Sequence, residues 1–276
     1  MDTKHLAILG AGNMGRALIG GLLRKGTPAE RISVGEAVPA ARETLARELG
    51  LQATADNLTA VEHAQVVVLA IKPQDIAAAL QPLQPVLQRN RPLVLSVAAG
   101  VRVAALQAAC GPGVPVVRAM PNRPALVGAG VTGLYAPAEV DETHRAGAQD
   151  IMAAVGDVVW VPNEDALDIV TALSGSGPAY YFLLAELTMQ AAIDLGLDEA
   201  AARRLAVGTL YGAGVLAHAS DGDLARLRQE VTSKGGTTEA ALRVLQGADL
   251  RGIVARAIEA AANRSRELAD LSGSMR

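Results

Sequence analysis

The chain has 276 residues, of which 50% are hydrophobic and 19% are charged, so it can bury a substantial core. A net charge of −3 argues against binding to nucleic acid through a basic surface. The single cysteine, Cys110, excludes an internal disulfide, and four scattered histidines predict no metal site.

The N-terminal segment runs directly into a glycine-rich motif and does not resemble a signal peptide. No uncharged apolar run approaches the roughly 20 residues that a membrane span needs. These features predict a soluble, cytoplasmic protein that has neither a membrane nor a nucleic acid as its partner.

The first part of the chain alternates short apolar runs with helical stretches. The apolar runs are residues 6–9, 32–34, 66–71, 93–97, 114–120, 131–135 and 158–161. Helical patterns cover residues 16–25 and 40–49. Continuous apolar runs are typical of strands buried on both faces, so the pattern indicates an α/β fold with a doubly wound parallel sheet.

After about Pro162 the strand-like runs disappear, and helices are predicted over residues 165–173 and 179–195. Gly196 is suited to end the second of these helices, and Asp198 is suited to cap the next. We therefore expect two domains, at residues 1–162 and 163–276, with the second all-helical.

The segment of residues 205–217 carries no charge, so a helix there must be buried on nearly every side. A helical domain of about a hundred residues cannot supply that cover alone. The hypothesis is an obligate oligomer with an all-helical interface, in which Gly208, Gly212 and Gly214 let helices approach closely.

The sequence Gly10-Ala11-Gly12-Asn13-Met14-Gly15 is G-x-G-x-x-G, and it follows a predicted strand and opens a predicted helix. In this context Gly10 permits a tight turn, Gly12 lets a pyrophosphate approach the backbone, and Gly15 lets the helix pack closely. The N–H groups that follow, including those of Asn13 and Met14, can bind phosphates. The motif predicts a Rossmann dinucleotide site; the alternative is a plain glycine-rich turn.

Glu36 follows the second strand at the spacing expected for a residue that binds the adenosine ribose, which favours NADH over NADPH. Alternatively, Glu36 is an exposed loop charge, or it turns outward and leaves room for NADPH. Arg42 is expected a turn or more into the following helix. Further cofactor contacts are predicted at the ends of neighbouring strands: Asn57, Ala70, Lys72, Pro73 and Ala98. For Lys72, a solvated loop lysine is an equal alternative.

Three later segments resemble pyrroline-5-carboxylate reductases. They are residues 119–125, similar to the family's M-P-N-T-P-A, residues 173–180, identical to L-S-G-S-G-P-A-Y, and residues 231–245, similar to its C-terminal signature. The glycine motif and residues 70–73 also fit. Two residues depart from the family pattern, since Arg123 stands where Thr is usual and Lys234 where Pro is usual.

This resemblance implies a Rossmann domain followed by a helical dimerisation domain, with dimers that assemble further, often into decamers. It also implies reduction of Δ1-pyrroline-5-carboxylate to L-proline with NADPH or NADH. Because a protonated imine is already an electrophile, the enzyme needs orientation more than a strong acid, and no histidine lies in a family motif.

The predicted substrate loop contains Ser233, Gly235, Gly236, Thr237 and Thr238 at the start of a helix. We assign Ser233 and the N–H groups near Thr237 and Thr238 to the carboxylate, and the Thr238 hydroxyl to the ring nitrogen. Thr238 and Ser233 are thus the predicted catalytic residues. The alternative is a capped helix start without a ligand.

Ser176 either borders the substrate pocket or only shapes the entry to the long helix. Because the substrate loop lies in the helical domain, it must meet the nicotinamide across a domain boundary. The hypothesis that this boundary lies between subunits would leave a monomer without a complete site.

Three rival functions stay open. A related cyclic imino acid could be the substrate. A β-hydroxyacid dehydrogenase would use a catalytic lysine of its helical domain, but Lys234 is the only lysine beyond residue 72 and lies in a glycine loop. A non-catalytic NAD(P)-sensing module would bind cofactor without turnover.

Overall fold

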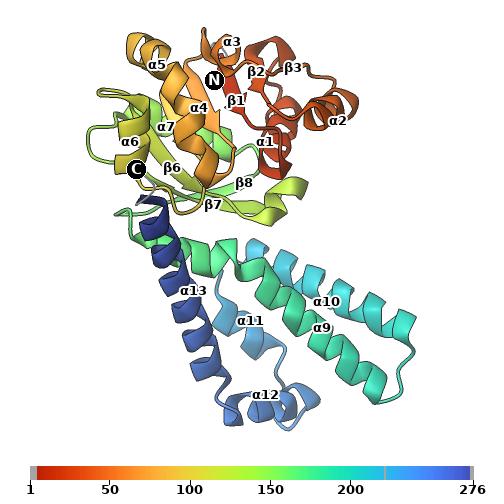
Figure 1. Cartoon of the computed structure of the whole chain (residues 1–276). Coiled ribbons are helices and arrows are strands. Elements are labelled where there is room, and N and C mark those ends of the chain that lie inside the picture. Colours follow the sequence, from red (N-terminus) through yellow and green to blue (C-terminus); the bar gives the residue numbers. More distant parts are fainter. Residues whose placement is uncertain (1–4, 221, 274–276) are drawn as a thin grey trace. The chain divides into compact units, whose positions relative to one another are not determined.

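The computed structural model describes residues 5–220 and 222–273. Its contacts divide the chain into two compact units, one of residues 1–176 with 261–276 and one of residues 177–260. Figure 1 labels most of the helices and strands of the two units. The predicted domain boundary at residues 162/163 stays a prediction.

The first unit is built on an eight-stranded sheet with the order β3-β2-β1-β4-β5-β6-β7-β8. The strands are β1 Leu6–Leu9, β2 Ile32–Gly35, β3 Ala53–Thr54, β4 Val66–Leu69, β5 Leu93–Ser96, β6 Val116–Met120, β7 Gly130–Tyr135 and β8 Gly156–Trp160. All residues of β1 and β4 are buried, as their uninterrupted apolar sequences predict. The predicted α/β, doubly wound fold is confirmed.

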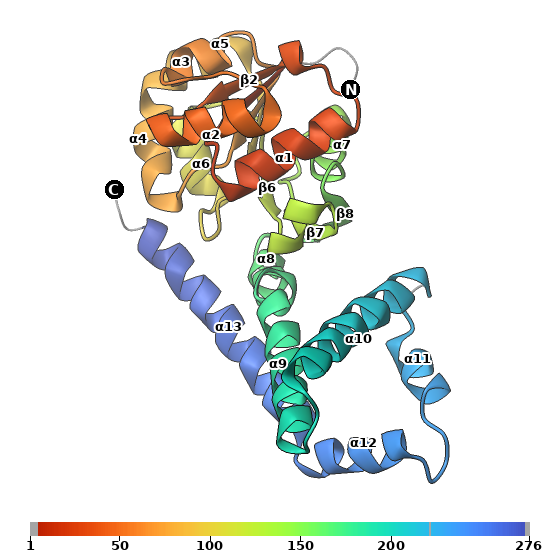
Figure 2. The ribbon, with the colours of Figure 1, turned by 90° about the vertical axis from the view of Figure 1, so that its right-hand side faces the viewer.

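Helices cover both faces of this sheet. One face packs against α1 Asn13–Arg24, α2 Pro39–Leu49 and α7 Glu142–Met152, through residues such as Leu18, Leu45 and Ile151; Figure 2 shows α1 and α2 side by side. The other face packs against α3 Asn57–Val61, α4 Ile76–Leu80, α5 Gln84–Asn90 and α6 Val103–Cys110. Short 3-10 turns lie at Ala29–Arg31 (η1), Pro73–Asp75 (η2), Gln81–Leu83 (η3) and Arg123–Val127 (η4).

Cys110, at the end of α6, is fully buried in the second of these cores. Burial raises the pKa of its thiol to about 12, so the thiol stays protonated. Cys110 therefore serves as a small apolar residue of this core.

The sheet is not parallel throughout. β7 runs antiparallel to β6, with Arg118 opposite Tyr135, and β8 runs parallel to β7. The connection from β6 to β7 contains only η4, which is too short for the crossover that a parallel neighbour requires. The predicted parallel sheet is therefore confirmed for β1 to β6, and the last two strands run in the opposite direction.

A buried network attaches the end of α13 Leu250–Gly273 to the first unit. The Ser265 hydroxyl donates to Asp168 Oδ1 at 2.6 Å, and Arg102 Nη2 donates to Asp168 Oδ2 at 3.1 Å. The Asp168 side chain is only 4% exposed, so its charge needs both partners. Asp168 lies on α8 Ala166–Val170, which continues as a π-helical turn, η5 Thr171–Gly175.

The second unit contains α9 Gly177–Asp194, α10 Glu199–Ala219, α11 Leu224–Glu230, α12 Thr237–Gly247 and the first part of α13. Gly196 has a left-handed φ of +98° after the end of α9. Asp198 caps α10 by accepting from the Ala201 N–H at 3.0 Å. Both predicted helix boundaries are confirmed. None of the described helices is long and apolar enough to cross a membrane.

Helices α9 and α10 lie side by side as an antiparallel pair (Figure 1). Many large apolar side chains of this pair are exposed. They are Tyr181, Phe182, Leu183, Leu184, Leu187, Leu205, Val207, Tyr211, Val215 and Leu216. Beyond the helix's own backbone, a Cβ added at Gly208, Gly212 or Gly214 would meet nothing within 4 Å in the described part of the chain. In a single chain the apolar faces of α9 and α10 are therefore exposed, and the oligomer hypothesis holds that a partner subunit buries them.

The turn between β1 and α1 depends on two glycines for internal reasons. Gly10 has a φ of +101°, and a Cβ there would lie 2.5 Å from the Ala70 carbonyl oxygen. A Cβ at Gly15 would collide with the Gly10 carbonyl oxygen. At Gly12, in contrast, an added Cβ would meet nothing within 4 Å. No contact inside the described chain requires a glycine at residue 12.

We therefore expect Gly15→Ala to lower the free energy of unfolding by about 1–3 kcal/mol, because backbone cannot yield to the added methyl group. Gly12→Ala should cost less than about 1 kcal/mol. Urea denaturation of the two variants beside the parent protein checks this. Equal destabilisation by both substitutions would contradict the proposed packing of the turn.

Candidate functional site

The loops that follow β1, β2, β4 and β5 meet at one edge of the sheet. The Gly10 N–H donates to Gly35 O at 2.7 Å, and the Ala70 N–H donates to Leu9 O at 2.8 Å. The strand order reverses between β1 and β4, which is where open α/β sheets bind their ligands. The predicted cofactor residues follow these strands: Gly10, Gly12, Asn13, Met14 and Gly15 after β1, Glu36 after β2, Ala70, Lys72 and Pro73 after β4, and Ala98 after β5.

The Glu36 carboxylate lies against the glycine-rich turn. Its Oε2 accepts from the Ala11 N–H at 2.7 Å, and its Oε1 accepts from the Val38 N–H at 2.8 Å. Glu36 is therefore half-buried and held in place, which is not the behaviour of a freely exposed loop charge. Its carboxylate is positioned where a dinucleotide on the glycine turn would place its adenosine ribose.

The remaining cofactor candidates contribute in different ways. Asn57 is the first residue of α3. Its side chain packs so closely on Gly35 that a Cβ added at Gly35 would collide with Asn57 Oδ1. Pro73 begins η2, and Lys72 before it is exposed. Ala98 is 6% exposed, and its N–H donates to Ser96 Oγ at 3.3 Å.

Arg42 is the fourth residue of α2, as its expected place in the helix implies. Its side chain nevertheless folds back, and Nη1 donates to the carbonyl oxygens of Glu36 at 2.8 Å and Ala37 at 2.9 Å. Position along a helix does not show which way a long side chain turns, so this contact could not be predicted from the sequence.

Two of the segments that carry the family resemblance meet inside the first unit. Asn122 is 8% exposed; its Nδ2 donates to Ser174 O at 3.2 Å, and its Oδ1 accepts from the Val131 N–H at 3.0 Å. A Cβ at Gly175 would lie 2.7 Å from Met120 Cε. Asn122 thus holds the π-helical turn, a role that the sequence analysis missed although it singled out the segment.

Ser176 follows this turn, and its N–H donates to Thr171 O at 2.8 Å, which is the hydrogen bond that defines a π-helix. Arg123, which replaces a usual Thr, is exposed at the start of η4. The fold at this point therefore tolerates the substitution.

The predicted substrate loop lies in the second unit and contains a tight turn. The Gly236 N–H donates to Ser233 O at 3.0 Å, and Gly235 has a φ of +74°. This combination is typical of a type II turn with Lys234 in its second position, where Pro is favoured. The turn therefore forms although Lys replaces the usual Pro.

The first turn of α12 offers free backbone donors. Gly236 is the N-cap residue, and no side chain caps the helix, so capping does not account for the hydroxyl residues of this loop. The Gly235 N–H donates to Glu239 Oε2 at 2.5 Å. The N–H groups of Thr237 and Thr238, as first-turn helix donors, have no partner among the described residues. They are available to an anion.

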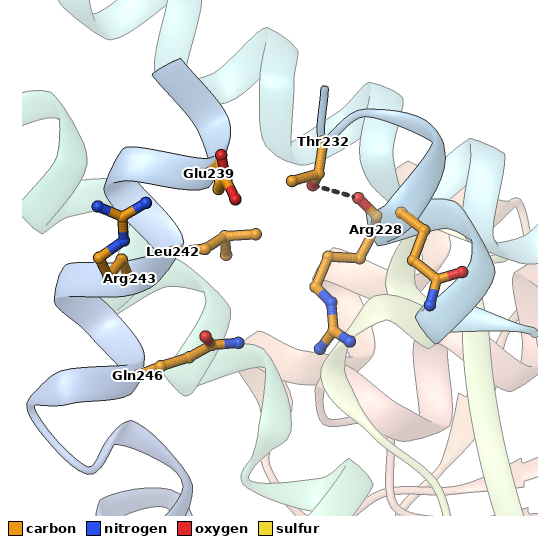
Figure 3. Close-up of a pocket in the computed structure, with 7 residues that line it drawn as sticks. Arg228, Thr232, Glu239, Leu242, Arg243 and Gln246 are labelled. Carbon is orange, nitrogen blue, oxygen red and sulfur yellow. Dashed lines mark hydrogen bonds between the residues drawn. The ribbon is translucent and has the colours of Figure 1, made fainter. Parts of the chain in front are cut away.

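A cavity of about 330 Å³ lies beside this loop, between α11 and α12. Figure 3 shows Arg228 and Gln246 extending toward each other from the two helices, and the Thr232 hydroxyl donates to Arg228 O at 2.6 Å. The cavity is lined by Arg228, Gln229, Thr232, Glu239, Leu242, Arg243 and Gln246. The predicted substrate residues are not among them, so the loop and the cavity are separate features of the second unit.

Two protein families match the chain. The family described as pyrroline-5-carboxylate reductase dimerisation matches residues 164–268, and the family described as NADP oxidoreductase, coenzyme F420-dependent, matches residues 5–100.

Similar proteins extend this match over the whole length. The pyrroline-5-carboxylate reductase of Pseudomonas aeruginosa is 43% identical over 273 residues, covering 99% of this chain and 100% of that protein. The solved structure of a pyrroline-5-carboxylate reductase from Coxiella burnetii has a TM-score of 0.93 at 40% identity, covering 97% of this chain and 99% of that one. The Plasmodium falciparum pyrroline carboxylate reductase, solved with NADP bound, has a TM-score of 0.83 at 27% identity over 98% and 99% of the two chains.

The resemblance seen in separate motifs thus holds along the entire sequence and fold, and the chain belongs to the pyrroline-5-carboxylate reductase family.

Proposed function

We propose that this chain reduces Δ1-pyrroline-5-carboxylate to L-proline with a nicotinamide cofactor in the cytoplasm. The observation that carries the proposal is its similarity, over 99% of its length, to relatives that bear this activity's name. The two loops described above supply the chemistry that the reaction needs.

The first loop fits a dinucleotide. The space beside the Gly12 backbone is open, and no contact inside the described chain requires a glycine there. The close approach of a pyrophosphate would explain the glycine. The N-terminus of α1 adds N–H donors for the phosphates, including those of Asn13 and Met14. Glu36 would accept hydrogen bonds from ribose hydroxyls, which favours NADH. When bound, the reduced nicotinamide supplies the hydride.

The second loop fits a carboxylate beside a ring nitrogen. The N–H groups of Thr237 and Thr238 and the Ser233 hydroxyl would bind the carboxylate, while the turn of Gly235 and Gly236 keeps side chains away from it. The Thr238 hydroxyl would hold the proton of the ring nitrogen. These groups orient an imine that is already electrophilic, so no stronger acid is needed.

A homodimer through α9 and α10, which assembles further into a decamer, is the oligomer that we propose. Its support is the exposed apolar surface of this helix pair, which also contains a groove of about 440 Å³ lined almost entirely by apolar residues. The match of residues 164–268 to a dimerisation family adds to this support.

The dehydrogenase alternative finds little support in the structure. Lys234 is exposed in the second position of a β-turn, and no hydrogen bond or ion pair among the described residues holds its side chain in a fixed position. Measurements of turnover distinguish the other two alternatives, a related cyclic imino acid as the substrate and a non-catalytic NAD(P)-sensing module.

We expect purified protein to oxidise NADH and NADPH when Δ1-pyrroline-5-carboxylate is added, with loss of the absorbance of the reduced nicotinamide. Glu36 predicts the faster rate with NADH. Turnover only with another cyclic imino acid would identify a paralogue, and cofactor binding without any turnover would identify a sensing module.

Thr238→Val should lower kcat/KM by roughly 10- to 100-fold, because a hydrogen bond to a charged group is lost. Thr143→Val is the control, since Thr143 is exposed and, like Thr238, is the second residue of its helix, here α7. Steady-state kinetics of both variants decide the matter: equal effects, or no loss in Thr238→Val, would remove Thr238 from the site.

Lys234→Pro should raise the free energy of unfolding by about 0.4–1 kcal/mol, because Pro pre-sets the second position of the turn and the Lys234 N–H has no partner to lose among the described residues. Chemical denaturation measures this, with Lys234→Gln as the control that removes only the charge. Both variants should retain turnover. Loss of nearly all activity in both would instead support lysine acid–base catalysis.

A further inference from the structure

The loop between β5 and α6, residues 97–102, lies at the edge of the sheet where the predicted cofactor residues gather. It carries Ala98, and in the order of the strands β5 lies beyond β4, whereas β2, which precedes Glu36, lies beyond β1. A dinucleotide whose adenosine ribose is bound by Glu36 would therefore extend its nicotinamide half toward the loop of residues 97–102.

A carboxylate from a distant segment of the chain binds the end of this loop. Glu164 Oε1 accepts from the N–H of Val103, the first residue of α6, at 2.6 Å, and from Arg118 Nη1 at 2.7 Å. Arg118 lies on β6, and because its side chain is only 7% exposed, its charge needs a partner inside the protein. Glu164 therefore neutralises a buried cation and satisfies a free backbone donor at the start of α6.

The last residue of the loop, Arg102, is held by two further carboxylates. Its Nη1 donates to Asp165 Oδ1 at 2.7 Å, and its Nη2 donates to Asp168 Oδ2 at 3.1 Å. The buried Asp168 also accepts from the Ser265 hydroxyl at 2.6 Å, so the end of α13 belongs to the same network. Two hydrogen bonds to one buried carboxylate fix the positions of both donors, which are Arg102 and Ser265.

One side of the loop stays free of this network. Gly100 packs against α13, since a Cβ added there would lie 3.6 Å from Ala269 N. Ala99, the residue before it, is exposed. The hydrogen bonds of the network reach the loop only at Arg102 and Val103, where the loop ends. They can therefore fix the loop without occupying its exposed side.

We propose that Glu164 and Asp168 are positioning residues for the nicotinamide half of the cofactor. They hold the loop of residues 97–102 in one position, and the exposed side of that loop fixes the orientation of the nicotinamide ring from which the hydride leaves. The two carboxylates act through the loop and make no contact with the cofactor themselves. The inference rests on the proposed use of a nicotinamide cofactor, but not on the identity of the imino acid.

The test compares the binding of NADH with that of ADP-ribose, which lacks the nicotinamide ring, by calorimetry without any substrate. Glu164→Ala removes the shared acceptor oxygen, and Glu164→Gln keeps an acceptor oxygen without the charge. Ser265→Ala is a milder change that removes one hydroxyl from Asp168. Asp141→Ala is the control, because it removes a carboxylate that accepts from the His144 N–H at the start of α7, outside the network.

In Glu164→Ala we expect the Kd for NADH to rise roughly 10-fold and kcat to fall roughly 10- to 100-fold, because a ring displaced by about 1 Å loses its alignment. The Kd for ADP-ribose should change less than about threefold, since the glycine turn and Glu36 stay intact. Glu164→Gln should lie between Glu164→Ala and the parent protein. Ser265→Ala should weaken NADH selectively by roughly three- to tenfold. Asp141→Ala should lower stability without changing either Kd.

Equal weakening of NADH and ADP-ribose in Glu164→Ala would overturn the proposal and show that the network only stabilises the first unit. Unchanged binding of NADH would overturn it as well. If Glu164→Ala does not fold, the same comparison in Ser265→Ala decides. If the variants weaken NADH selectively but the parent protein reduces no Δ1-pyrroline-5-carboxylate, the proposed reaction fails while the positioning role stands.

Discussion

The close contact between Gly10 and Gly15 is the constraint on which the first unit's site depends. The Gly10 carbonyl oxygen occupies the space that any side chain at residue 15 would need, and the Ala70 carbonyl oxygen closes the other side of Gly10. The turn from β1 into α1 is therefore as tight as a backbone allows. It brings the N-terminus of α1 to the sheet edge where the strand order reverses, so that backbone donors, Glu36 and Arg42 gather around one loop.

The second unit supplies a different kind of site. The turn from Ser233 to Gly236 ends at a helix whose first N–H groups no side chain caps. Leaving such donors free costs stability, and a bound carboxylate would recover it. The same unit exposes the apolar faces of α9 and α10, so its own core is small and its stability is expected to depend on association.

Much of the fold could be predicted because the sequences of β1 and β4 indicate their burial directly. Each strand has four residues, and all of them are apolar and buried. β3 escaped prediction because it has only two, half-buried residues. The reversed direction of β7 depends on the length of the connection before it rather than on its own residues. The π-helical turn was not predicted either, since the spacing of apolar residues does not show that one turn of a helix contains an extra residue.

The candidate sites were predictable where glycine has a fixed physical meaning, as at Gly10, Gly15 and Gly235. They were not predictable where the direction of a long side chain decides. Arg42 was expected a turn or more into the helix after Glu36, and nothing in its position along α2 shows that its side chain folds back onto the loop of Glu36. Asn122 likewise joins segments about fifty residues apart in the chain, which only the fold brings together.

The proposed reaction requires that a hydride pass from the cofactor's nicotinamide to the imine carbon of Δ1-pyrroline-5-carboxylate. The most direct measurement is mass spectrometry of the proline formed with cofactor deuterated at nicotinamide C4, using each of the two C4 diastereomers. We expect one diastereomer to transfer its deuterium to a ring carbon of proline and the other to transfer none. Cofactor oxidation that leaves proline free of deuterium with both diastereomers would contradict it.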